Sequence, residues 1–212
     1  MIPVTLQPEP ANFDTDVRRP GRRYLQKVST PNFGQKRNKH WTKALDGLHE
    51  AYKGICAYTC LYLPSKSEGS VDHFRPKSLC PELAYEWGNF RLAQPKVNSH
   101  KGDSTDVLDP FAVEAGWFVL DFPSCLVKAG EGIPRHLPKR VKKTIDVLKL
   151  NDDDSLVQRR CDIMRAYSNG EMGLSFLRKR YPFIAAEIIR QGIDETTASA
   201  LFKTLNMDVN KA

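Results

Sequence analysis

Residues 69–102 constrain the fold most, because their pattern indicates two short strands followed by a short helix. Residues 69–74, Gly-Ser-Val-Asp-His-Phe, are β-prone, with a glycine at the entry and Pro76 just past the exit. Residues 89–93, Asn-Phe-Arg-Leu-Ala, form a second run with alternating side-chain character. Pro95 suits the first position of a helix, and Gly102 is typical of a helix end. The stretch therefore predicts a β–β–α unit.

Four polar side chains in this unit have chemical rather than structural character: Asp72, His73, Asn89 and Asn98. The carboxylate of Asp72 and the amide oxygen of Asn98 are hard ligands of the kind that Mg²⁺ prefers. His73 titrates near neutral pH, so it is a candidate general base acting on water. A metal, a base and nearby cations suit phosphodiester hydrolysis. The candidate phosphate-binding cations are Arg75, Lys77 and Lys101.

This grouping makes a geometric demand on the first strand. Adjacent residues of a regular strand point to opposite faces, so Asp72 and His73 share one metal site only if the strand ends or bulges there. Because Pro76 follows closely, we expect the strand to end at this point. Asn98 and Lys101 are three residues apart and therefore share a face of the helix.

Three motifs in the stretch resemble the parts of an HNH endonuclease of the ββα-metal family. They are Asp-His-Phe-Arg-Pro-Lys (72–77), Trp-Gly-Asn-Phe (87–90) and Asn-Ser-His-Lys-Gly (98–102). The pattern is similar to PtuB-like HNH proteins, the nuclease partners in Septu and some retron antiphage systems, which pair with an ATPase of the PtuA type. Thr-Ile-Asp-Val-Leu-Lys-Leu-Asn (144–151) is similar to that family as well, so the resemblance covers most of the chain beyond residue 40.

The resemblance implies a role for each candidate. It makes His73 the general base and makes Asp72 and Asn98 ligands of Mg²⁺ or another divalent cation such as Mn²⁺. Asn89 matches the central asparagine that braces the loop holding the histidine, so the implied catalytic set is His73, Asn89 and Asp72. Lys101 matches a basic residue one helical turn beyond the second ligand. The third position of the motif is Asn98 rather than histidine, a variant within the superfamily.

The chain departs from the family in its cysteines. Many HNH proteins hold a structural zinc with two cysteine pairs, and the first pair corresponds to Cys56 and Cys60. The second pair falls at Gln94 and Val97, where there is no cysteine. Two thiolates do not complete a tetrahedral site. We therefore predict that the structural zinc is lost, and whether Cys56 or Cys60 binds any metal stays open.

The N-terminal region is strongly basic. The chain of 212 residues carries a formal net charge of +7, which favours polyanionic partners. Residues 18–43 contain nine Lys or Arg and no acid, with aromatic residues between them. This composition predicts contact with nucleic acid or docking to an acidic surface of a partner protein. The candidate contact residues are Arg18, Arg19, Arg22, Arg23, Lys36, Arg37 and Lys39.

The predicted fold class is α+β: a ββα-metal HNH core, an additional β-hairpin and a mostly helical C-terminal region. Its regions are a basic N-terminal arm (1–40, extended to about residue 17 because of its prolines), the HNH core (41–110) and the remainder (111–212). An amphipathic helix is expected over 40–53, a short strand at 61–64 and a hairpin over 117–128. A helix opens at Pro138, and an aspartate cluster at 152–154 caps the next. Further helices are expected at 170–180, 182–191 and 194–205.

Other sequence features indicate the compartment. The five cysteines lack disulfide-scaffold spacing, which favours a reducing environment. The sequence has no apolar run of membrane-spanning length and no signal-peptide pattern at its N-terminus. We therefore expect a cytoplasmic protein that does not enter a membrane.

The function that these patterns favour is metal-dependent HNH endonuclease activity, with the chain as the effector of an antiphage defence system. The expected partners are DNA or RNA and a PtuA-type ATPase, with a retron reverse transcriptase and its RNA/DNA as a further partner. One alternative keeps the chemistry but makes RNA, including tRNA, the substrate. Another is a non-catalytic HNH-like adaptor that binds an ATPase or nucleic acid.

Overall fold

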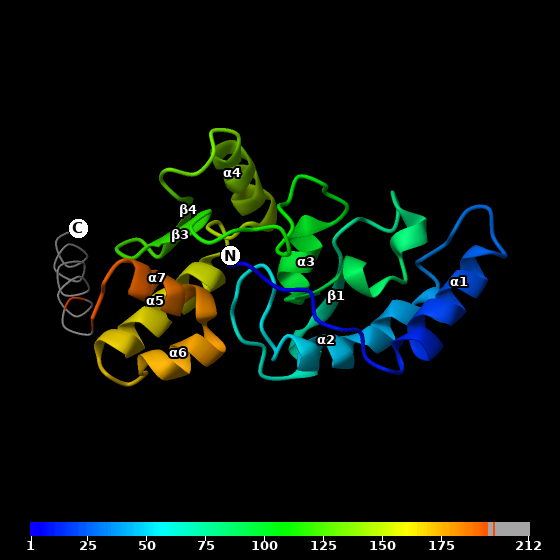
Figure 1. Ribbon diagram of the computed structural model, residues 1–212, viewed down its shortest axis with the longest axis horizontal. Helices are drawn as coiled ribbons and strands as arrows, with labels where there is room; N and C mark the ends of the chain where they lie inside the picture. The colour runs from blue at the N-terminus through cyan, green and yellow to red at the C-terminus, as the bar shows by residue number, and fades with distance from the viewer. Residues whose placement is uncertain (195–196, 198–212) are drawn as a thin grey trace. The chain divides into compact units, whose positions relative to one another are not determined.

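A computed structural model describes residues 1–194 and 197 (Figure 1). The chain divides into two compact units: Val4–Ala112, and Val113 onward together with Met1–Pro3. Each unit contains helices and one two-stranded antiparallel sheet, which confirms the α+β class. Within the part of the chain that is described, no helix is both long and apolar enough to cross a membrane.

The predicted β–β–α unit forms in the first of these units. Strand β1 (Ser70–His73) pairs antiparallel with β2 (Phe90–Ala93), and α3 (Pro95–Lys101) follows directly. Pro95 occupies the first turn of α3, where no N–H partner is lost. Gly102 ends the helix with a φ of +50°, a conformation that favours glycine.

The pairing of β1 with β2 is regular to its last residue. Asp72 lies opposite Arg91, and His73 lies opposite Phe90. Strand β1 does end at His73, as expected, but it is not bulged before that point. Asp72 and His73 therefore leave the strand on opposite faces, because side chains alternate along a regular strand. The convergence that a shared metal site demands does not arise from the backbone of β1.

The N-terminal residues are helical earlier than expected. A π-helical turn (η1, Asp14–Arg18) continues into α1 (Arg19–Leu25), whereas we predicted an extended arm to about residue 17. Phe13 and Val17 are buried, and they share one helical face because they are four residues apart. The prolines behind the prediction all precede residue 11, so they do not interrupt this helix.

Close packing holds α1 in place. A Cβ added to Gly21 would lie 2.0 Å from the ring of Tyr85, so the helix backbone lies directly against that ring. Only glycine fits at this contact. The basic N-terminal region is therefore part of the same packed unit as the β–β–α residues.

The helix predicted over residues 40–53 forms in two parts. A 3₁₀ turn (η3, His40–Ala44) leads into α2 (Leu45–Ala51), and Trp41 and Leu48 are buried as expected. The strand predicted at 61–64 is reduced to a single bridge between Ile55 and Tyr62. Short 3₁₀ turns complete the unit at Lys36–Asn38, Lys66–Glu68, Pro81–Leu83 and Trp87–Asn89.

The second unit contains the predicted hairpin and helices. Its elements are β3 (Phe118–Asp121), β4 (Leu126–Ala129), α4 (Leu137–Leu148), α5 (Asp154–Ser168), α6 (Leu174–Arg180) and α7 (Pro182–Arg190). Asp153 caps α5 by accepting a hydrogen bond from the Ser155 N–H at 3.1 Å, as the aspartate cluster predicted. The helix predicted at 194–205 lies outside the described residues, apart from its first residue and residue 197.

Candidate active site

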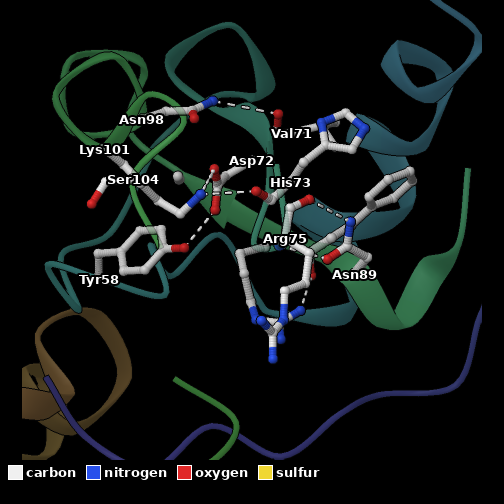
Figure 2. Close-up of polar contacts among 12 residues, drawn as sticks. Tyr58, Val71, Asp72, His73, Arg75, Asn89, Asn98, Lys101 and Ser104 are labelled. Atoms are coloured by element: carbon white, nitrogen blue, oxygen red, sulfur yellow. Dashed lines mark hydrogen bonds and ion pairs between the residues drawn. The ribbon is translucent and has the colours of Figure 1, made fainter. Parts of the chain in front are cut away.

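The carboxylate of Asp72 is the centre of a buried polar cluster on one face of the β1–β2 hairpin (Figure 2). Asp72 is only 2% exposed, and both of its oxygens accept hydrogen bonds. The Tyr58 hydroxyl donates to Oδ2 at 2.5 Å, and the Lys101 ammonium donates to Oδ1 at 3.0 Å. The same ammonium donates to the main-chain oxygen of His73 at 2.8 Å. Lys101 thus fastens the end of α3 to two consecutive residues of β1.

This cluster is closed to solvent and electrically balanced. The side chain of Lys101 is fully buried, so its charge is compensated by Asp72 rather than by water. Burial raises the pKa of Tyr58 well above its ordinary value, and the neighbouring charge of Asp72 raises it further. The phenol therefore stays protonated and acts as a hydrogen-bond donor at neutral pH.

A second ion pair, with a buried arginine and a half-buried aspartate, lies on the same face of the hairpin. The guanidinium of Arg91 binds Asp109, with its shortest contact at 2.7 Å, and it donates to the main-chain oxygen of Gly88 at 2.8 Å. It also lies 3.5 Å from the ring centroid of Phe111. Asp72 and Arg91 are directly opposed in the register. Each forms its own ion pair, Asp72 with Lys101 and Arg91 with Asp109, so neither charge depends only on the other for compensation.

The side chain of His73 points to the opposite face and into aromatic surroundings. Its ring centroid lies 5.1 Å from the rings of both Trp41 and Phe90, edge-on, and the residue is 6% exposed. Figure 2 shows the imidazole turned away from Tyr58 and Lys101. Burial, together with the smaller effect of the charges of Lys77 and Lys101, lowers the pKa of His73 to about 4. The imidazole is therefore neutral at physiological pH.

One hydrogen bond selects the tautomer of His73. Its Nε2 lies 2.9 Å from the main-chain oxygen of Ala84. A carbonyl oxygen only accepts hydrogen bonds, so Nε2 carries the proton. In the neutral ring, Nδ1 is then the nitrogen with a lone pair, and it is the atom that can accept a proton.

Asn89 joins the residues that follow β1 to the start of β2. Its Oδ1 accepts from the Arg75 N–H at 2.8 Å, while its Nδ2 donates to the main-chain oxygens of Arg75 at 3.0 Å and Leu83 at 3.1 Å. Leu83 precedes Ala84, so Asn89 holds both the loop after His73 and the segment that binds its ring. This is the bracing position that the resemblance implies, and a catalytic role stays a prediction.

Asn98 attaches the middle of α3 to β1. Its Nδ2 donates to the Ser70 hydroxyl at 3.0 Å and to the main-chain oxygen of Val71 at 3.4 Å. These are the two residues that precede Asp72 in the strand. The structure therefore brings Asn98 and Lys101 of α3 together with β1, as Figure 2 shows. The amide nitrogen of Asn98 is engaged in hydrogen bonds that attach α3 to the strand.

The predicted metal ligands do not fit a divalent cation in this arrangement. Both oxygens of Asp72 are already engaged, and the ammonium of Lys101 supplies the positive charge next to them. Among residues 1–194 and 197, no group of three or more His, Cys, Asp or Glu side chains is placed to hold a metal ion. A metal-binding role for Asp72 and Asn98 stays a prediction that needs a different arrangement of Lys101.

The three predicted phosphate-binding cations differ in exposure. Arg75 is exposed, and Lys77 is half-buried with its ammonium 5.4 Å from the ring centroid of Trp41. Arg75 therefore reaches solvent, and Lys77 lies on the side of the hairpin where His73 packs against Trp41. Lys101 is buried within the Asp72 cluster, so a phosphate reaches it only after a rearrangement.

The predicted basic contact residues fall into two groups. Three form ion pairs within the unit: Arg18 with Glu9 and Glu86, Arg22 with Glu86, and Arg19 with Asp14. The others are exposed: Arg23, Lys36, Arg37 and Lys39. Acids outside residues 18–43 thus neutralise part of the basic cluster, and Glu86 in particular is too far away in the sequence for local charge counting to detect it.

The turn that carries Cys56 and Cys60 has a packing role. The buried Sγ of Cys56 accepts from the N–H groups of Thr59 at 3.5 Å and Gln94 at 3.4 Å. These contacts hold the turn at the N-terminus of α3. Tyr58 lies in this turn and reaches Asp72 through its hydroxyl. Nothing local in the sequence marks Tyr58 as a partner of Asp72, because the two residues are 14 positions apart.

Comparison with known proteins shows a similarity over part of the chain. No protein-family model matches the chain. The chain is 30% identical over 134 residues, 62% of its length, to Septu protein PtuB from Bacillus thuringiensis. These residues cover 51% of that protein, so the chain spans about half the length of the curated relative that it matches. The chain is thus similar to a protein of the Septu system over most of its own length.

Proposed function

We propose that the chain is a PtuB-like component of an antiphage defence system and an HNH-type endonuclease that hydrolyses nucleic-acid phosphodiester bonds. The observation that carries this proposal is His73. It is a neutral histidine in one tautomer, at the end of the first strand of a β–β–α unit. The similarity to Septu protein PtuB supports the same assignment.

In the proposed reaction, His73 acts as the general base. Its Nδ1 takes a proton from the water that attacks phosphorus, while Nε2 keeps its hydrogen bond to Ala84. That bond orients the ring and stabilises the imidazolium that forms. The bond from phosphorus to the leaving 3′ oxygen breaks, and that oxygen takes up a proton from solvent. The cations of Arg75 and Lys77 bind phosphate oxygens, and Lys77 does so on the His73 side of the hairpin.

Asn89 is a positioning residue in this account. It holds the main chain of Arg75 and Leu83, so it fixes the loop that carries one phosphate-binding cation and the segment that orients His73. Loss of Asn89 would therefore lower the rate by misplacing the base rather than by removing a reacting group.

The divalent cation is a separate part of the proposal. Mg²⁺ or Mn²⁺ is the cofactor that the HNH resemblance implies, but Asp72 is engaged by Lys101 and Tyr58 in this structure. The roles proposed for His73, Asn89 and the phosphate-binding cations do not use a divalent cation. Whether cleavage needs one is decided by assaying with Mg²⁺ or with EDTA.

The partners follow from the same likeness. We propose that the chain acts with a PtuA-type ATPase on DNA or RNA, and that a retron reverse transcriptase with its RNA/DNA is a partner in systems that contain one. The exposed cations Arg23, Lys36, Arg37 and Lys39 are the proposed contact residues for nucleic acid or an acidic partner surface.

A second candidate is a non-catalytic adaptor that keeps an HNH-like shell. One observation favours it: the carboxylate expected to bind metal is instead buried in an ion pair with Lys101. An adaptor would bind the ATPase or nucleic acid without cleaving it. Its exposed cations would then account for all of its contact with nucleic acid.

An activity screen separates these functions. The purified chain is incubated with plasmid DNA and with total RNA, with Mg²⁺ or EDTA, and with or without the ATPase encoded beside it. We expect cleavage of at least one nucleic acid when the ATPase is present. Cleavage of RNA alone would select the RNA-cleaving alternative. Binding without cleavage under every condition would contradict the nuclease proposal and support the adaptor.

A further inference from the structure

We propose that Lys101 and a divalent cation exclude each other at Asp72, so that the Lys101 ammonium keeps a latent cation site closed. The site binds Mg²⁺ or Mn²⁺ only after Lys101 has left. This inference deepens the proposed function, because it concerns control of the same site.

The partners of Lys101 are oxygens of the kind that bind divalent cations. Its ammonium contacts Asp72 Oδ1 at 3.0 Å and the main-chain oxygen of His73 at 2.8 Å. A carboxylate and a carbonyl oxygen that converge on one point are ligands suited to Mg²⁺ or Mn²⁺. The hydroxyl of Tyr58 lies on the other carboxylate oxygen. The Lys101 ammonium therefore occupies the position that a bound divalent cation would take.

Charge explains why the two occupants cannot coexist. Asp72 and Lys101 are 2% and 0% exposed at their side chains, so their charges balance each other in a dry environment. A divalent ion added to this pair would leave two uncompensated positive charges there, which is strongly unfavourable.

The chain offers a way for Lys101 to leave. Lys101 is the last residue of α3, a helix of seven residues, and the exposed Gly102 and Asp103 follow it. Helix ends open more readily than helix middles. Asn98 is one turn earlier and is tied to Ser70 and Val71, so it keeps α3 attached to β1 when the last turn opens. Release of Lys101 therefore does not require α3 to detach.

The test removes the charge of Lys101 and measures Mn²⁺ binding without nucleic acid. Lys101→Met keeps the length of the side chain, and Mn²⁺ bound to the folded protein is measured by electron paramagnetic resonance. We expect Lys101→Met to bind Mn²⁺ at least about ten-fold more tightly than the wild type does. The gain should vanish in Asp72→Asn/Lys101→Met. Lys96→Met, on the exposed part of α3, is the matched control and should leave Mn²⁺ binding unchanged.

Two results would overturn the inference. One is Asp72-dependent Mn²⁺ binding by the wild type that is as tight as in Lys101→Met; the other is a variant that gains no affinity. If Lys101→Met does not fold alone, it is refolded with and without Mn²⁺. Recovery only with Mn²⁺ supports the inference, and no recovery with Mn²⁺ contradicts it. Because no substrate is involved, these results are independent of whether the chain cleaves nucleic acid.

Discussion

The two faces of the β1–β2 hairpin place two adjacent residues in opposite physical environments. On one face, Asp72 and Arg91 are buried charges, each compensated by a partner. On the other face, His73 lies between aromatic rings, and burial lowers its pKa to about 4. Strand alternation alone produces this division, since the register is regular through both residues. A buried, ion-paired carboxylate and a neutral imidazole can therefore be neighbours in the sequence without sharing a site.

The largest expected effect concerns the face that carries His73. Replacement of His73 by Ala should lower the cleavage rate by roughly 10²–10⁴-fold, the usual contribution of a general base. His136→Ala, which changes an exposed histidine in the other unit, should leave the rate unchanged. Initial rates with the nucleic acid that the wild type cleaves provide the measurement. Equal rates for His73→Ala and the wild type would remove His73 from the mechanism.

The next effect concerns the charged face. Asp72→Ala leaves the Lys101 ammonium buried without its counter-charge, so the free energy of unfolding should fall by roughly 3–5 kcal/mol. The exposed pair of Lys142 with Asp146 provides a control, and Asp146→Ala should cost less than about 1 kcal/mol. Urea denaturation measures both. Equal losses for the two variants would show that the Asp72 cluster is not closed to water.

The pKa of His73 predicts how stability depends on pH. The unfolded chain binds a proton near its ordinary pKa of 6.5, whereas the folded chain does so only at about 4. Stability from this residue is therefore complete above pH 6.5 and is lost as the pH falls, up to roughly 3 kcal/mol at pH 4. Urea denaturation of the wild type and of His73→Gln between pH 4 and pH 7 isolates the contribution. An identical pH dependence in both proteins would place His73 in contact with water.

A smaller effect is expected at Tyr58. Tyr58→Phe removes one hydrogen bond to the Asp72 carboxylate, which should lower the free energy of unfolding by about 2 kcal/mol. In an Asp72→Ala background the same substitution should cost much less, because the acceptor is already gone. A double-mutant cycle by urea denaturation gives the coupling. Additive losses would mean that the Tyr58 hydroxyl does not support Asp72.

Local patterns predicted the frame of the site but not its connections. Pro95 and Gly102 marked the ends of α3, and β-prone runs marked both strands. The engagement of Asp72 was not predictable, because Tyr58 and Lys101 are 14 and 29 residues away from it. Likewise, Arg22 is neutralised by Glu86, 64 residues further on. Sequence spacing specifies elements, whereas the pairing of buried charges depends on how those elements pack.

The most direct test of whether Lys101 keeps the Asp72 site closed is the position of Lys101 in crystals of the wild-type chain grown with Mn²⁺. The anomalous signal of manganese locates any bound ion, and the same map shows the lysine. We expect the ammonium in hydrogen-bonding contact with Asp72 Oδ1, as in this structure, and no manganese at the carboxylate. A manganese ion bound to Asp72 while the lysine ammonium still contacts Oδ1 would contradict it.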